Sequence, residues 1–141
     1  VKRYYRCFIG GILKDKYGTI DLPIGEDRHH KSRRRVSKTG QPAITHYQVL
    51  QEFKDYSLVE VRLETGRTHQ IRVHFAHINH PLLGDELYHG DCKKIKRVAL
   101  HSYKVEFIHP VTKNKMVMVK ELPYDMKVLL GEEYDYRKAC K

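Results

Sequence analysis

The middle of the sequence changes from the periodicity of a strand to that of a helix within a few residues. Val59, Val61 and Leu63 alternate with charged neighbours, a pattern typical of a half-buried strand. Ile71 and Phe75 then follow at a spacing of four, with another apolar residue three positions later, so they share one face of a helix. This succession predicts an amphipathic helix with one buried stripe, entered through a strand-to-helix turn that displays functional groups.

The turn and the helix carry an unusual density of polar chemistry, because residues 65–74 read TGRTHQIRVH. Arg72 leaves the helix away from the apolar stripe, where a guanidinium can hold an anion or a carboxylate. We expect Thr65 or Thr68 to cap the start of the helix and Asn79 to end it, since His80-Pro81 follows. The alternative interpretation is an ordinary amphipathic helix whose basic residues are simply solvated.

The pattern of apolar and polar residues in the rest of the chain predicts an α+β domain with a mostly antiparallel mixed sheet and a few flanking helices. The strands of residues 45–49 and 59–63 read as a hairpin, and apolar spacing in the tail predicts a short packing helix. A length of 141 residues suits one domain. Other strand-like or extended segments are residues 4–9, 18–25, 103–107 and 116–119, and the apolar residues of the tail are Met126, Leu129 and Leu130.

The charge balance points to a polyanionic partner. Lys and Arg number 27 against 17 Asp and Glu, which gives a net charge of +10, and such a field favours RNA or DNA over a membrane. Residues 26–40 form a basic segment without apolar periodicity, which we expect to be a mobile loop that contacts phosphate; the alternative is a solvated linker. The predicted RNA-binding residues are Arg33, Arg34, Arg35, Lys93, Lys94 and Arg97.

The cysteines and histidines predict neither disulfides nor a metal site. Cys7, Cys92 and Cys140 are odd in number and widely spaced, so we expect reduced thiols and a cytoplasmic protein. Histidines recur at positions 74, 77 and 80, but no acidic or thiol ligand lies near them in the sequence.

Several motifs in order make the chain resemble the RluA-type RNA pseudouridine synthases. The resemblance spans nearly all 141 residues and implies the C-terminal portion of a single catalytic domain. It also implies that uridine of ribosomal or transfer RNA is flipped into a pocket and isomerised without cofactor or metal. The matching segments are Lys2-Arg3-Tyr4 before Gly10, IDLPI at residues 20–24, GQPAITHY at 40–47, TGRTHQIRVH at 65–74, PLLGD at 81–85, RVALHS at 97–102, and His109-Pro110.

The same resemblance assigns site residues one by one. Tyr4 matches the tyrosine that packs on the target base, and Arg72 matches the arginine that pairs with the catalytic aspartate. Leu100 matches an apolar residue of the substrate pocket, while Arg67 and His69 are expected near the RNA side of the helix. Without the resemblance, Tyr4 and Leu100 are equally well explained as core residues.

One motif of that family has no match here. Its catalytic aspartate lies in His-Arg-Leu-Asp ahead of the tyrosine segment, and no aspartate of this chain has that context; Asp85 is expected to be structural. We therefore predict that the chain is inactive alone and self-associates or pairs with a missing N-terminal half through an uncovered sheet edge. The alternatives are a non-catalytic RNA-binding module with the same fold and a basic scaffold for protein partners.

Overall fold

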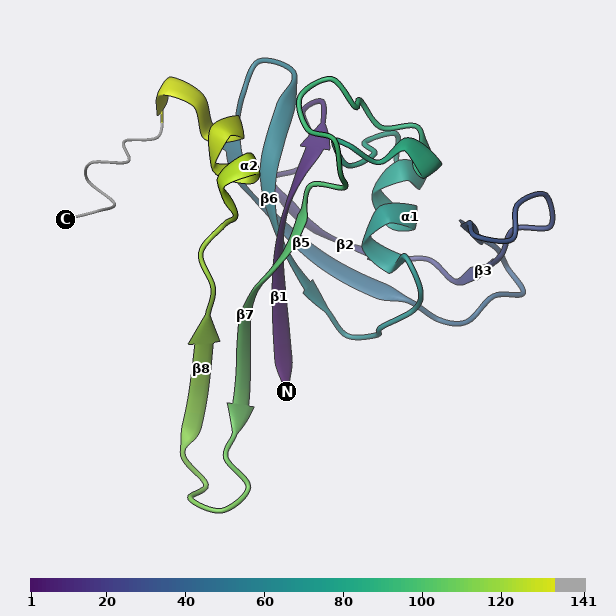
Figure 1. The fold of residues 1–141 in the computed structure, drawn as a ribbon. Coiled ribbons are helices and arrows are strands. Elements are labelled where there is room, and N and C mark those ends of the chain that lie inside the picture. The colour runs from purple at the N-terminus through teal and green to yellow at the C-terminus, as the bar shows by residue number, and fades with distance from the viewer. Residues whose placement is uncertain (134–141) are drawn as a thin grey trace.

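The computed structural model describes residues 1–133, which form one six-stranded antiparallel sheet, a separate two-stranded hairpin and a few short helices (Figure 1). The order across the large sheet is β2-β5-β6-β1-β7-β8, and the hairpin pairs β3 with β4. This arrangement confirms the predicted α+β class. The strands are β1 (Lys2–Gly10), β2 (Tyr17–Asp21), β3 (Ile24–Glu26), β4 (Arg34–Val36), β5 (Ile44–Glu52), β6 (Tyr56–Leu63), β7 (Leu100–Ile108) and β8 (Lys115–Val119).

Helices cover both faces of the sheet, because central strand β1 is apolar on both sides. The helices are α1 (Gln70–His77), η1 (Glu86–Tyr88), α2 (Tyr124–Lys127) and η2 (Val128–Glu133). Cys7 and Ile9 pack toward the side of the sheet that carries Ile71 and Phe75 of α1. Phe8 points the other way, into the cluster that contains Met126 of α2. The apolar stripe of α1 and the packing helix in the tail are thus confirmed.

The boundaries of α1 agree with the sequence at one end only. Asn79 adopts the left-handed conformation expected of a helix stop, with φ of 69°. The start is different, because neither threonine caps it: His69 occupies the N-cap position with φ of 56° and no side-chain cap bond. The cap prediction was therefore wrong.

The basic segment is not the irregular loop that its composition predicted. Residues 24–26 and 34–36 pair as the antiparallel hairpin of β3 and β4, and only its tip lacks strand structure. Ile24 and Val36 pair directly and supply apolar contacts that the dominant charge concealed. This part of the chain is a folded projection held against α1.

Strand β8 is an edge strand whose residues are all exposed. With β7 it forms a hairpin that runs beside β1 and whose turn extends beyond it, away from α1 (Figure 1). Cys7 and Cys92 are free thiols, whereas Cys140 lies outside the described residues. No helix within residues 1–133 has the length and apolarity needed to cross a membrane.

Candidate nucleic-acid interface

Gln70 attaches the strand-to-helix turn to strand β5 and uses its whole amide group to do so. Its Nε2 donates to the Ile44 carbonyl and to Thr45 Oγ1, both at 3.0 Å. Its Oε1 accepts from Thr65 Oγ1 at 2.7 Å and from the Arg67 amide at 3.0 Å. Because Gln70 is buried, these four bonds fix the path of the turn and therefore the direction in which α1 leaves it.

The buried His74 extends this network to the segment between β2 and β3. The Leu22 carbonyl can only accept, so His74 Nε2 donates to it at 2.9 Å. In a neutral ring that carries its proton on Nε2, Nδ1 accepts, so the Thr45 hydroxyl donates to His74 Nδ1 at 2.8 Å. Burial lowers the pKa of His74 from its ordinary value, which favours the neutral ring with its proton on Nε2. No group within residues 1–133 unites three or more side chains that could hold a metal ion.

Arg72 projects from α1 toward the loop of the PLLGD motif and holds its aspartate. Nε donates to Asp85 Oδ2 and Nη2 donates to Asp85 Oδ1, both at 2.9 Å. Asp85 is fully buried and also accepts from the Tyr88 amide at the start of η1. The platform that the sequence predicted for a carboxylate is therefore occupied by a carboxylate of the same chain, and Asp85 has the structural role expected of it.

A basic hollow of about 700 Å³ lies between the hairpin tip, the PLLGD loop and the segment before β7. Arg33, Arg72 and Arg97 come from three separate elements and all line it, together with His30 and His89. Each arginine also has an acidic partner: Asp27 for Arg33, Asp85 for Arg72 and Asp125 for Arg97. These ion pairs hold the guanidinium groups in place around the hollow, an arrangement suited to binding phosphate groups.

The other predicted RNA-binding residues are dispersed. Arg34 and Arg35 border a second hollow of about 550 Å³ between the hairpin and the end of α1. Lys93 is exposed, and Lys94 pairs with Asp55 and Asp91 near the turn between β5 and β6. These two lysines do not line the hollow that contains Arg33.

Arg67 and His69, which the sequence placed together, have separate surroundings. Arg67 Nε donates to the Pro42 carbonyl at 2.8 Å and lines a hollow of about 350 Å³ beside Gly40. The His69 ring lies against Tyr88, with Nδ1 at 2.8 Å from the Tyr88 hydroxyl. Burial and the charge of Arg72 lower the pKa of His69.

Tyr4 lies on the side of the sheet away from α1, so the structure does not bring it together with Arg72. Strand alternation puts Tyr4 on the same face as Phe8, where the Lys104 ammonium lies 4.2 Å from the centre of its ring. The neighbouring Tyr5 faces the α1 side and packs, like Leu100, against the cluster that contains Ile71. The structure therefore places Tyr4 and Arg72 on different sides of the sheet, and Tyr5 is the tyrosine of this strand that faces α1. Two consecutive tyrosines in one strand gave no signal as to which faces the helix.

Comparison with known proteins gives a consistent family relationship. Residues 1–77 match the family described as RNA pseudouridylate synthase. An uncharacterized RNA pseudouridine synthase of Bacillus subtilis (strain 168), YhcT, is 51% identical over 131 residues, covering 92% of this chain and 43% of the relative. The ribosomal large subunit pseudouridine synthase D of Haemophilus influenzae is 38% identical over 145 residues, covering 93% of this chain and 44% of the relative. The chain thus spans less than half the length of these curated relatives.

Solved structures show the same fold. The human protein RNA Pseudouridylate Synthase Domain Containing 1 superposes with a TM-score of 0.73 at 24% identity, covering 87% of this chain and 55% of the human chain. The human protein RNA Pseudouridylate Synthase Domain Containing 4 also superposes with a TM-score of 0.73, covering 92% of this chain and 60% of the human one. At this identity the likeness concerns the fold alone.

Proposed function

Because this chain belongs to the RNA pseudouridylate synthase family and is of the RluA type, we propose that it is part of an enzyme that isomerises uridine to pseudouridine in structured RNA. The observation that carries the proposal is the family match across residues 1–77, which includes the Arg72 segment. The hollow lined by Arg33, Arg72 and Arg97 supports a polyanionic substrate. Relatives named for the large ribosomal subunit favour ribosomal over transfer RNA.

The 141-residue chain alone is inactive in this proposal, because it lacks the His-Arg-Leu-Asp motif. Asp85 is unsuited to replace the missing nucleophile, since it is fully buried and bonded to Arg72. Four other aspartates are engaged in ion pairs with lysine or arginine side chains, namely Asp27, Asp55, Asp91 and Asp125. The setting in which the enzyme acts is proposed to be cytoplasmic, because Cys7 and Cys92 are free thiols.

In this proposal Tyr4 is the tyrosine that packs on the target base, because its Lys2-Arg3-Tyr4 segment lies within the residues that match the family. Its ring lines an open hollow of about 390 Å³ and lies 4.2 Å from the Lys104 ammonium. Tyr5 packs against the core cluster on the α1 side, as Leu100 does. An accessible aromatic ring can receive a flipped base, which costs a few kcal/mol to unstack.

Tritium release from RNA carrying 5-tritiated uridine tests the activity, because isomerisation expels that hydrogen. The chain is assayed alone and mixed with an aspartate-bearing N-terminal half of a relative. Release only in the mixture is the expected result, and the Tyr4→Ala variant is expected to abolish it. Release by the chain alone would overturn the inactivity. RNA binding without release in either arm would favour the non-catalytic binding module.

A further inference from the structure

The hairpin of β3 and β4 is joined to α1 by a small apolar cluster of its own. Ile24 of β3 packs there with Val73 of α1 and the ring of Tyr88 in η1, and Val36 of β4 lies against them. This cluster is distinct from the two larger ones on either side of the sheet. Backbone bonds between Ile24 and Gln41 hold the β3 side of the hairpin. Toward α1 the hairpin has few apolar contacts, so a polar bond from β4 has a large share in its position there.

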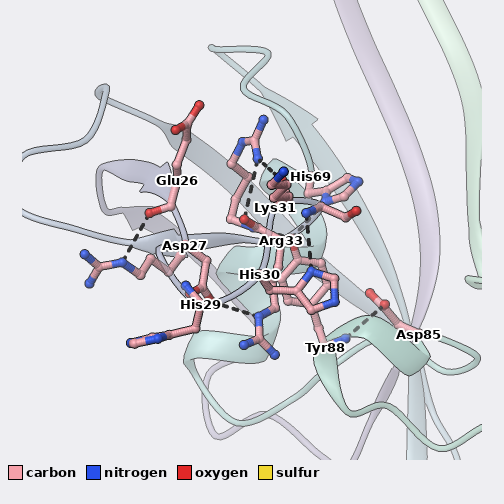
Figure 2. A network of polar contacts seen from close by, with 12 residues as sticks. Glu26, Asp27, His29, His30, Lys31, Arg33, His69, Asp85 and Tyr88 are labelled. Carbon is pink, nitrogen blue, oxygen red and sulfur yellow. Dashed lines mark hydrogen bonds and ion pairs between the residues drawn. The ribbon is translucent and has the colours of Figure 1, made fainter.

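Tyr88 supplies that polar bond, and its direction follows from the partners. The Arg34 amide in β4 donates to the Tyr88 hydroxyl oxygen at 2.8 Å. The hydroxyl has one proton of its own, which bonds His69 Nδ1 at 2.8 Å. Tyr88 therefore connects the hairpin to the residue before α1, and Figure 2 shows His69, Tyr88 and Asp85 beside the hairpin tip.

Both ends of this connection are fixed by other interactions. Tyr88 is buried, and its amide donates to Asp85 Oδ1 at 3.3 Å, next to the Arg72 ion pair. His69 holds the left-handed backbone conformation, which is unfavourable for a residue with a side chain and persists only where the surroundings enforce it. Because its backbone is strained and its ring is hydrogen-bonded to a buried tyrosine, His69 can hold the Tyr88 hydroxyl in place. The charged groups around it are Arg72, Asp85 and Arg34.

The hydrogen bonds of Tyr88 fix the hairpin side of the basic hollow relative to its α1 side. Arg33 lies next to Arg34 in the chain and lines the hollow from the hairpin side, bonded to Asp27 at 2.8 Å. Arg72 lines it from α1. The separation of these two guanidinium groups therefore depends on how firmly the hairpin is held at Arg34.

We propose that Tyr88 and His69 act as positioning residues that hold the β3–β4 hairpin against α1 and thereby set the affinity of the basic hollow for the phosphate backbone of RNA. The part that concerns RNA rests on the proposed function. The hydrogen-bonded connection itself does not.

The Tyr88→Phe variant tests the connection, because it removes only the hydroxyl and keeps the buried ring. Amide hydrogen exchange is measured on the 141-residue chain, and exchange at Arg34 and its hairpin neighbours is expected to accelerate about five- to tenfold, as for loss of one or two hydrogen bonds. Exchange in β1 and β6 is expected to stay unchanged. Tyr17→Phe is the matched control, since Tyr17 is 76% exposed.

His69 variants separate positioning from a merely structural effect. Asparagine tolerates the left-handed conformation and offers Oδ1 where the ring offers Nδ1, so His69→Asn is expected to keep hairpin protection. His69→Ala is expected to match Tyr88→Phe, and the double variant is expected to be no worse than either one. Unchanged exchange in Tyr88→Phe, or acceleration spread evenly over the sheet, would overturn the proposal.

Affinity for a fluorescent structured RNA is measured on the same variants at several salt concentrations. Tyr88→Phe and His69→Ala are expected to weaken binding several-fold, while Tyr17→Phe and His69→Asn do not. Normal RNA affinity in Tyr88→Phe despite a loosened hairpin would overturn the link to binding. If the unaltered chain binds no RNA, the link between the connection and RNA affinity fails, while the exchange results still decide whether the connection exists and tritium release from the mixture still decides the proposed function.

Discussion

The Arg72 guanidinium and the Asp85 carboxylate form a two-bond ion pair that joins α1 to the PLLGD loop, with both N···O distances at 2.9 Å. The pair links the two most distinctive segments of the sequence, through residues that lie 13 positions apart in the chain. Because Asp85 is fully buried, the pair is part of the folded interior, while Arg72 also lines the basic hollow.

Arg72→Ala is expected to lower the free energy of unfolding by about 3–5 kcal/mol, because it leaves a buried carboxylate without its cation. Urea denaturation followed by circular dichroism measures the change. Arg97→Ala is the control: Arg97 also makes two bonds to an aspartate, but both partners are 44% exposed. Its loss should cost only about 0–1 kcal/mol. Equal effects of the two substitutions would contradict the buried role of Asp85.

Gly84 is expected to tolerate no side chain. A Cβ there would lie 1.8 Å from the Arg97 carbonyl oxygen, and the backbone has φ of 76°. Gly84→Ala should therefore destabilise the chain by about 4 kcal/mol or more, among the largest effects of single substitutions. Gly66→Ala is the matched control, since a Cβ at that position would have nothing within 4 Å. Thermal unfolding of both variants decides the comparison, and a stable Gly84→Ala protein would refute the close approach.

Mild acid is expected to destabilise the fold through two histidines. Burial is the main cause that lowers the pKa of both His69 and His74, so the folded chain favours their neutral forms. Their contribution to stability is complete above the ordinary histidine pKa of about 6.5 and is lost as the pH falls through the lowered values. The free energy of unfolding, measured from about pH 8 to about pH 5, should therefore decrease. His74→Gln should reduce this decrease, whereas a flat profile in the unaltered chain would count against neutral buried rings.

Strand β8 is expected to make the 141-residue chain self-associate. It is an edge strand on which Val117 is 50% exposed and Met118 is 63% exposed, a surface that promotes pairing between edges. Light scattering after size-exclusion chromatography should show dimers or larger species, and Val117→Lys should shift them toward the monomer. Val128→Lys, equally exposed but located beyond α2, should not. A monomeric unaltered chain would refute this expectation.

Local periodicity was sufficient to predict most elements of the fold. The alternation around Val59 and the spacing of Ile71 and Phe75 correspond to β6 and α1, because burial of one face imposes that repeat on the sequence. The hairpin of β3 and β4 could not be predicted in this way, because its strands have three residues each and are too short to show a repeat. Net charge there indicated a surface segment but not a folded one.

The candidate site was likewise predicted in part from the sequence, and the tertiary structure decided the rest. The residue types of TGRTHQIRVH and PLLGD were enough to indicate an arginine that holds a carboxylate and a structural aspartate at Asp85, because such chemistry depends on side-chain identity. Only the tertiary structure decided that these two are partners, that Tyr5 rather than Tyr4 faces α1, and that Arg33 and Arg97 reach one hollow. Those relations depend on which strands pair and in which register. They therefore depend on contacts between residues far apart in the sequence, which local patterns do not encode.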